Sequence, residues 1–172
     1  MKEYIFLQVE KLKKKYRTSD PFTILEAMNV QIWDTPQSCK LKGFCFLANQ
    51  TFYVSIHPDL PEEMRRIVAA HELGHIILHK SQLKMAMMTD YNLNNYQKDT
   101  EYEANLFAAD LLISDEEVRK ELLEADGAYY AMCSRLNITP TMMSYKLFSM
   151  DDRGYDYPLP LGIDSRCLGR EA

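Results

Sequence analysis

The most regular pattern of apolar and polar residues lies between positions 100 and 112. Apolar residues recur there at spacings of three and four, which predicts an amphipathic helix with one face toward a core. They are Ala104, Phe107, Ala108, Leu111 and Leu112. At about 100° per residue, Glu101 falls about 50° from the centre of this stripe and Glu103 more than about 100° from it. The helix is therefore expected to aim Glu101 inward and Glu103 away.

A second helix is predicted from about residue 62 onward. Pro61 suits a first turn, Asp59 can cap it, and the acidic residues 62 and 63 favour its positive N-terminal end. Apolar residues then cover much of the helix circumference, as burial in a core requires. They are Ile67, Val68, Ala70, Ile76, Ile77 and Leu78. Gly74 costs up to about 1 kcal/mol relative to alanine inside a helix, so we expect another backbone to pass close to it.

The rest of the pattern completes an α+β fold, in which a small antiparallel sheet of about three strands packs with helices. Strands are predicted at residues 30–33, 43–48 and 51–56, and the last two form an antiparallel hairpin. Further helices are predicted at residues 4–16, 22–28, 115–124, 128–136 and 141–148. The stretch 81–99 has no clear period, and we expect a loop there that lies over a cleft.

The second helix carries His71, Glu72 and His75 in the HExxH arrangement of zinc hydrolases. Residues four apart lie on one face of a helix, about 6 Å apart along its axis, so both imidazoles can reach one metal ion at about 2 Å. Glu72 stays beside the ion, where it can accept a proton from water as the general base of peptide hydrolysis. The alternative is a pair of histidines that only pack in the core.

A hydrolytic zinc site needs three protein ligands and an open position for water. His79 starts about 12 Å along the axis from His71, so three donors on this one helix cannot converge on one ion. We expect His79 to support the site or the fold. Glu101 is the predicted third ligand, and an ordinary first-turn acid stabilised by the helix dipole is the alternative. Asn105, one turn later, can accept a hydrogen bond from a ligand imidazole and fix its tautomer.

Zinc is the first choice of metal for two histidines and a glutamate, with manganese and iron as alternatives because occupancy in the cell also depends on supply. An oxyanion donor should complete the site. Three tyrosines lie within sequence range, but no spacing rule selects one of them: Tyr91, Tyr96 and Tyr102.

Composition sets the outer bounds. With 172 residues and 47% hydrophobic content, the chain suits one domain with a sizeable core. We expect that domain over residues 1–150, with a catalytic core at 1–112, a helical C-terminal subdomain at 113–150 and an extended tail at 151–172. The net charge of −5 gives no basic footprint for nucleic acid. The one basic run, residues 11–17, is typical of a solvated helix end, and a patch for an acidic partner is the alternative.

The four cysteines form no CxxC pair and follow no disulfide-scaffold spacing, so we interpret them as reduced thiols. They are Cys39, Cys45, Cys133 and Cys167. The apolar stretch after Glu3 is too short for a signal peptide, and no window is long enough for a membrane span. We therefore expect a cytoplasmic protein without membrane contact.

The run from His71 to His79, followed by the run from Glu101 to Leu112, resembles the ImmA/IrrE family of bacterial and phage metallopeptidases. The similarity extends to residues 20–22 opening a short helix, to the strand pair, and to the turn at 136–140, and it covers about residues 15–150. One departure is that Ile113 and Ser114 follow Leu112 where the family often has Met and Pro. Ser114 forms a capping box with Glu117, so this change is expected to be structurally neutral.

This resemblance implies a zincin-like fold of the gluzincin type. It implies His71, His75 and Glu101 as metal ligands and Glu72 as the catalytic acid/base. Members resemble regulatory proteases of phages and mobile elements that cleave a helix-turn-helix repressor, and such a repressor is the partner that the resemblance predicts.

Two other functions compete with a zinc-dependent peptidase. The first is a docking protein that binds a repressor or antitoxin without efficient cleavage and uses the metal as a structural staple. The second is a DNA-binding regulator that uses the C-terminal helices, which resemble a helix-turn-helix in outline. In an acidic chain with only Arg135 and Lys146 nearby, packing or partner docking is favoured over DNA reading, so we expect no direct nucleic-acid binding.

Overall fold

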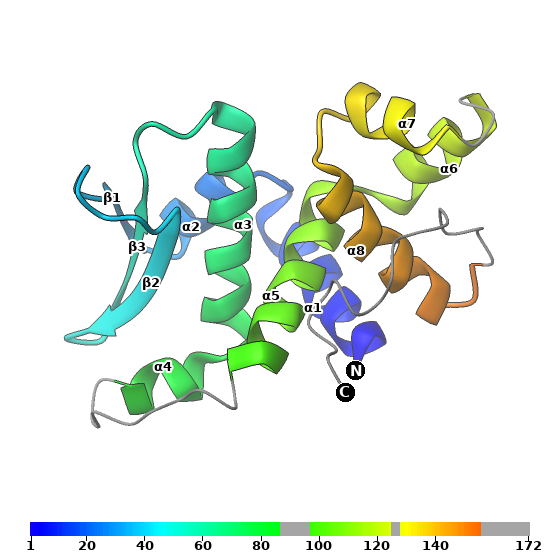
Figure 1. Cartoon of the computed structure of the whole chain (residues 1–172). Helices are drawn as coiled ribbons and strands as arrows, with labels where there is room; N and C mark the ends of the chain where they lie inside the picture. The colour runs from blue at the N-terminus through cyan, green and yellow to red at the C-terminus, as the bar shows by residue number, and fades with distance from the viewer. Residues whose placement is uncertain (87–96, 125–127, 156–172) are drawn as a thin grey trace.

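The computed structural model describes residues 1–86, 97–124 and 128–155. Over these residues the chain has the predicted α+β fold, with one three-stranded sheet and a larger helical part (Figure 1). The strands are β1 (Gln31–Asp34), β2 (Gly43–Ala48) and β3 (Thr51–Ile56). The helices are α1 (Lys2–Tyr16), α2 (Pro21–Ala27), α3 (Glu62–Leu78), α4 (Lys80–Ala86), α5 (Gln97–Leu112), α6 (Asp115–Glu124), α7 (Tyr129–Arg135) and α8 (Pro140–Asp152).

The sheet has the order β1-β3-β2, so the last strand in sequence lies in the middle. The predicted hairpin is confirmed, with Gly43 opposite Ile56 in an antiparallel pair. The prediction of a wholly antiparallel sheet is wrong, because β1 runs parallel to β3 with Gln31 opposite Tyr53. The alternation of apolar and polar residues along a strand shows which side chains share a face of the sheet. Because this alternation is the same in parallel and antiparallel pairs, it does not predict the direction of β1.

The prediction of a loop at residues 81–99 is wrong at both of its ends. Helix α4 occupies Lys80–Ala86 and α5 begins at Gln97, while residues 87–96, with Tyr91 and Tyr96, lie outside the described part. The segment of α4 has no apolar period, but lysine, glutamine, leucine, methionine and alanine are all good helix formers. Similarly, α8 continues to Asp152, so the segment predicted as a tail begins inside a helix.

Helix α3 begins without the predicted side-chain cap. Its N-cap residue is Pro61, which cannot cap through a side chain, and Asp59 lies two residues earlier. The backbone N–H of Asp59 instead donates to the Nδ1 atom of His57. The first-turn acids Glu62 and Glu63 remain as the predicted complement to the helix dipole.

Helices α3 and α5 pack along each other at Gly74, which confirms the expected close approach of a second backbone. A Cβ atom at Gly74 would lie 3.2 Å from both Cα and O of Ala104 and 3.2 Å from Cδ1 of Phe107. Because position 74 lies inside the HExxH segment and position 104 lies close to Glu101, this contact fixes how the two halves of the candidate site face each other.

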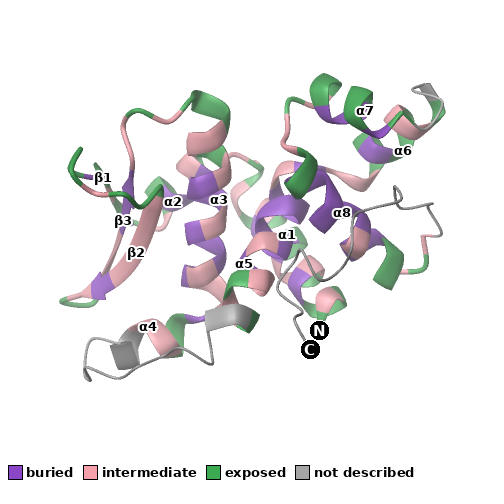
Figure 2. Ribbon diagram, viewed as in Figure 1, coloured by how far each residue is buried: buried purple, intermediate pink, exposed green. Residues whose placement is uncertain are grey.

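The core forms around α3 and α5, which the sheet covers on one side and α1 and α8 on the other. Figure 2 shows buried residues along α3, α5 and α8, with exposed residues on the outer turns. The largest fully buried side chains include Leu73 on α3, Phe107 on α5 and Met143 on α8. Over the residues that the structure describes, there is no helix with both the length and the apolar character needed to cross a membrane.

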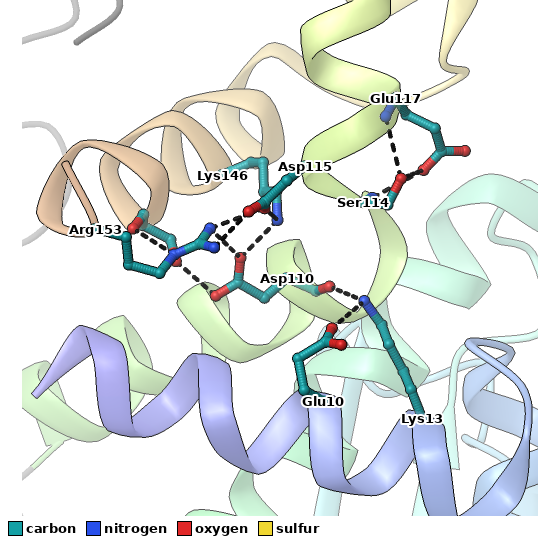
Figure 3. A network of polar contacts seen from close by, with 9 residues as sticks. Glu10, Lys13, Asp110, Ser114, Asp115, Glu117, Lys146 and Arg153 are labelled. Atoms are coloured by element: carbon teal, nitrogen blue, oxygen red, sulfur yellow. Dashed lines mark hydrogen bonds and ion pairs between the residues drawn. The ribbon is translucent and has the colours of Figure 1, made fainter. Parts of the chain in front are cut away.

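A buried ionic network ties α8 to α5 and α6 (Figure 3). The Lys146 Nζ atom donates to Asp110 Oδ1 at 2.8 Å and lies 2.6 Å from Asp115 Oδ1. The side chains of Lys146 and Asp110 are both 0% exposed. Arg153 pairs with Asp115, and Lys13 of α1 donates to the Asp110 carbonyl at 2.6 Å. The carboxylates of Asp110 and Asp115 balance the charges of Lys146 and Arg153, so α8 is held at a defined place beside the candidate site.

The predicted capping box at the start of α6 is confirmed and appears in the same view (Figure 3). The Ser114 N–H donates to Glu117 Oε2 at 2.8 Å, and the Glu117 N–H donates back to Ser114 Oγ at 3.1 Å.

Candidate metal centre

The two motif histidines meet at one point on α3. Their Nε2 atoms lie 3.0 Å apart, although both belong to rings that start from successive helical turns. The carboxylate of Glu101, near the start of α5, faces the same point. Its Oε2 lies 3.1 Å from His71 Nε2 and its Oε1 lies 3.3 Å from His75 Nε2. The structure therefore brings together the three residues predicted as ligands.

These distances fit a zinc ion. Ligand atoms bound tetrahedrally at about 2.0–2.1 Å lie about 3.3 Å from one another. The three observed separations of 3.0, 3.1 and 3.3 Å are close to this value. Two imidazoles and one carboxylate are a donor set that zinc accepts, and three protein ligands leave the fourth position open.

Each candidate ligand imidazole also has a partner at its other nitrogen. His71 Nδ1 lies 2.9 Å from Asn105 Oδ1, which confirms the predicted contact. Because an amide oxygen can only accept, His71 must carry its proton on Nδ1, which leaves Nε2 with a free lone pair. The amide of Asn105 in turn donates to the Tyr145 hydroxyl at 3.2 Å. This orientation is the one that metal binding through Nε2 requires.

A second chain of contacts leads away from His75. Its Nδ1 lies 3.1 Å from His79 Nδ1, and His79 Nε2 lies 2.8 Å from Glu103 Oε2. If His79 donates from Nε2 to the Glu103 oxygen, it accepts at Nδ1, so His75 donates from Nδ1 and keeps Nε2 free. His79 is buried, at 5% exposed, and supports the site as predicted. The expectation that Glu103 points away is wrong, because its side chain is 23% exposed against 55% for Glu101 and it orients His75 through His79.

Glu72 lies beside this centre in a mostly buried position, 6% exposed. Burial raises the pKa of its carboxyl above the usual range, and the nearby His71 and His75 offset part of this effect. The thiol of Cys45, on β2, hydrogen bonds to the same carboxylate. Burial also raises the pKa of the Cys45 thiol, so it stays protonated as a donor.

The charge pattern at the centre favours binding of a cation. When no metal is bound, a second proton on the Nε2 atoms can be donated to Glu101, and such hydrogen bonds with His71 and His75 hold the pKa of Glu101 well below its usual range, so Glu101 is ionised at neutral pH. Burial disfavours a charged His71, but its hydrogen bond with Glu101 and the charges of Glu72 and Glu101 raise its pKa. The negative charges of Glu72 and Glu101 therefore favour a cation beside His71, and a metal ion would be such a cation.

Sequence reasoning missed two contributors, Cys45 and Tyr145. Neither belongs to a motif or has a spacing relation to HExxH, and each reaches the site only through the fold. Cys45 is placed by the hairpin and Tyr145 by α8, beside the buried Lys146. Tyr102, named as one oxyanion candidate, packs its ring against that of Tyr145 with centroids 5.8 Å apart.

The chain is similar to known proteins over most of its length. The chain matches the IrrE N-terminal-like domain of the peptidase M78 family over residues 26–148. An uncharacterized immunity region protein 2 of Bacillus phage phi105 is 33% identical over 107 residues, which cover 62% of this chain and 66% of that protein, just under two thirds of its length. The metallopeptidase ImmA of Bacillus subtilis strain 168 is 25% identical over 142 residues, which cover 81% of this chain and 82% of ImmA.

The family match spans most of the chain and includes the HExxH helix, Glu101 and the helices that support them. Together with the two relatives, it shows that the chain belongs to the peptidase M78 family of IrrE N-terminal-like domains, the ImmA/IrrE family that its sequence resembles.

Proposed function

We propose that this protein is a zinc-dependent endopeptidase that cleaves a helix-turn-helix transcriptional repressor in the cytoplasm. The observation that carries the proposal is the convergence of His71 Nε2, His75 Nε2 and the Glu101 carboxylate within 3.3 Å of one another, with Glu72 beside them. A structural metal site has no open position and needs no free carboxylate beside the ion. Hydrolysis needs both an open position for water and a base that takes up the proton of that water.

In this proposal His71, His75 and Glu101 hold the ion, and manganese or iron are the alternatives to zinc. When bound, zinc lowers the pKa of a water molecule and polarises a carbonyl group. Glu72 accepts the proton of the attacking water and passes it to the leaving nitrogen of the substrate. Its raised pKa, caused by burial, suits a group that must both take up and release a proton.

The sheet offers a place for an extended substrate. Strand β2 is an edge strand of the sheet and packs against α3, and its Cys45 hydrogen bonds to Glu72. A peptide that adds to β2 as a further strand would be held by backbone hydrogen bonds, which demand little of its sequence. Its backbone would then pass over the HExxH helix, within reach of Glu72.

The repressor as substrate rests on the family resemblance and on the relatives. One relative is named for a phage immunity region and the other is named a metallopeptidase. Direct DNA reading by α7 and α8 is disfavoured, because Lys146 is buried in an ionic network and Arg135 pairs with Glu121 at 2.7 Å. The competing proposal is a docking protein that binds the repressor without cutting it.

The test is incubation of the zinc-loaded protein with a helix-turn-helix repressor encoded beside it, with and without chelator, followed by mass spectrometry of the products. We expect cleavage at one bond that the chelator abolishes. A stable complex without cleavage would instead support the docking protein, and cleavage that persists in chelator would contradict the metal mechanism.

A further inference from the structure

One face of the three-stranded sheet carries a row of aromatic side chains that the candidate centre does not use. In order of contact they are Trp33 of β1, Tyr53 of β3, and Phe46 and Phe44 of β2, with ring centroids 5.3, 5.0 and 6.1 Å apart. These four residues form the outer aromatic face. It is turned away from α3, because Gly43 and Cys45, which alternate with the two phenylalanines along β2, lie against that helix. Figure 1 shows the sheet at one end of the molecule, with α3 between the sheet and α5.

The four rings lie outside the hydrophobic core that the described residues form. Trp33 is 53% exposed, and the other three are half-buried. A strand with one face in water normally alternates apolar and polar residues, whereas a strand covered on both faces has a nearly continuous apolar run. Strand β2 has the second pattern, since every residue from Gly43 to Ala48 is apolar. Its sequence therefore suits a strand that is covered on both faces, and α3 covers one of them.

We propose that the outer aromatic face is a docking surface for an acidic amphipathic helix of a partner protein. The proposal does not depend on peptidase activity, because it concerns the face of the sheet opposite to the candidate centre.

The charges around this face favour an acidic partner. The chain has 25 acidic residues, yet none lies between residues 35 and 58, the segment that includes β2 and β3. Lys40 and Lys42 are exposed just before β2, on either side of Leu41, which is 56% exposed. Neither lysine is in an ion pair with another residue of the described part. A carboxylate on a partner would therefore meet two free ammonium groups and no acid of this segment.

The orientation of the rings adds to this preference. Phe46 and Tyr53 are stacked with an angle of 13° between their planes, and Phe44 and Phe46 are stacked at 25°. The faces of these rings are thus turned toward one another, and their edges remain for a partner. The edge of an aromatic ring carries the positive side of its quadrupole, so it favours carboxylate and carbonyl oxygens.

The width of the sheet suits one helix. Neighbouring strands lie about 4.8 Å apart, so the outer two of three strands are separated by about 10 Å. A helix with its side chains has a diameter of about 10–12 Å, and a helix laid on a sheet is a standard layer of protein structure. A stripe of apolar residues on such a helix would cover the rings, and acids beside the stripe would reach Lys40 and Lys42.

Two other occupants are disfavoured. A second copy in a two-fold dimer would place this surface against itself, which brings Lys40 and Lys42 toward the same lysines and supplies no acid. Single-stranded nucleic acid binds by stacking bases on ring faces. The faces of Phe46 and Tyr53 already stack on each other, so little of them is left for a base.

The experiment uses three synthetic helical peptides of equal length. The first has a leucine stripe at spacings of three and four, flanked by glutamates. The second has lysine in place of each glutamate, and the third has serine in place of each leucine. Binding to the full chain is measured by calorimetry and by the fluorescence of Trp33, the one tryptophan in the sequence. We expect the first peptide to bind at least about tenfold more tightly than the other two and to shift the emission of Trp33 to shorter wavelength.

An aromatic truncation tests where the peptide binds. Trp33→Ala removes the most exposed ring of the face and should weaken binding of the first peptide by at least about tenfold in calorimetry. Because Trp33 is 53% exposed, the variant should still fold. Tyr4→Ala removes an aromatic ring that is 59% exposed on α1, and this matched control should bind the peptide as the wild type does.

A charge reversal tests why it binds. The double variant Lys40→Glu and Lys42→Glu should lose the glutamate peptide and bind the lysine peptide more tightly instead. The double variant Lys11→Glu and Lys14→Glu changes the net charge equally at exposed positions of α1, and it should keep the wild-type preference.

Each contrary outcome identifies a different error. Absence of binding by the first peptide, or equal binding of the glutamate and lysine peptides, would overturn the proposal. Binding that Trp33→Ala retains would place the helix elsewhere. Tighter binding of oligothymidylate with quenching of Trp33 would make the face a nucleic-acid surface. Self-association of the full chain that Trp33→Ala abolishes in sedimentation would make it a dimer interface. Since no readout is cleavage, failure here leaves the proposed peptidase function in place.

Discussion

The Oδ1 atom of Asn105 lies 2.9 Å from Nδ1 of His71, so a side chain on α5 orients the ring of a proposed ligand on α3. Loss of such a partner lowers metal affinity by about 10–100-fold. We expect Asn105→Ala to weaken zinc binding by this factor, measured by competition with a chelating dye. Asn105→Asp keeps an acceptor oxygen at the same place and should lose much less.

Tyr145→Phe extends this prediction by one contact. It removes the hydroxyl that accepts from the Asn105 amide at 3.2 Å but leaves the His71 contact in place. Its effect on zinc affinity should be smaller than that of Asn105→Ala. An equal or larger effect would mean that Tyr145 acts on the site by another route.

Two glutamates on α5 test the assignment of the third ligand. Glu101 faces both Nε2 atoms, whereas Glu103 faces only His79. We expect Glu101→Ala to lose stoichiometric zinc in elemental analysis of the purified protein. Glu103→Ala should retain it with lower affinity, because only the orientation of His75 is disturbed. Full zinc in Glu101→Ala and none in Glu103→Ala would reverse the assignment.

Glu72→Gln separates metal binding from chemistry. The amide has nearly the same shape as the carboxylate but cannot accept the proton of water. We expect normal zinc content and an unchanged thermal unfolding midpoint, with cleavage of the repressor reduced by at least about 100-fold. Cleavage at the wild-type rate would show that Glu72 is not the general base.

Gly74→Ala tests the contact between α3 and α5. Helix propensity alone would stabilise the variant by about 1 kcal/mol. The new Cβ would lie 3.2 Å from Cα and O of Ala104, however, and backbone atoms cannot move aside as a flexible side chain can. Overpacking of this kind costs about 1–3 kcal/mol, so we expect a net loss of stability in urea unfolding. A more stable variant would show that the helices separate without cost.

The HExxH helix and the hairpin could be predicted because each depends on local sequence. The orientation of the two glutamates was predicted only in part, because Glu101 faces the Nε2 atoms with 55% of its side chain exposed, whereas Glu103 is 23% exposed and contacts His79. The pairing direction of β1 and the place of Tyr145 beside Asn105 depend on contacts between distant segments, which no single-segment pattern encodes. Helix α4 was missed for a different reason, since its helix formers lack an amphipathic stripe.

The burial of the charged side chains of Lys146 and Asp110 could not be predicted either. In the sequence, Lys146 counts as a basic residue near a helix-turn-helix outline, and the natural assumption is exposure to solvent. The structure instead places its ammonium group between Asp110 and Asp115 with no exposed surface. Such a position depends on carboxylates that lie 31 and more residues away and meet Lys146 only after α6 and α8 have packed.

This network makes stability depend on pH through Asp115. Burial alone would raise its pKa, but hydrogen bonds and charges from Arg153 and Lys146 outweigh this effect and lower the pKa from 3.8 to about 2. An acid with a lowered pKa in the folded state stabilises the fold above its unfolded pKa and loses that contribution as pH falls toward the folded pKa. The window is therefore about pH 4 to 2, and the full contribution is on the order of 2 kcal/mol.

We expect the free energy of unfolding of the metal-free protein to exceed that of Asp115→Asn at pH 7, and about half of the pH-dependent part of this difference to be lost by pH 3. Urea unfolding of both proteins at pH 7, 5, 4 and 3 measures it, and the difference between them cancels the titration of other acids. Lys14→Ala, at an exposed position of α1, is the control, and its difference from wild type should not follow the same pH dependence. A gap between wild type and Asp115→Asn that stays constant down to pH 3 would show that Asp115 has an ordinary pKa in the folded protein, and that Lys146 and Arg153 do not hold it ionised.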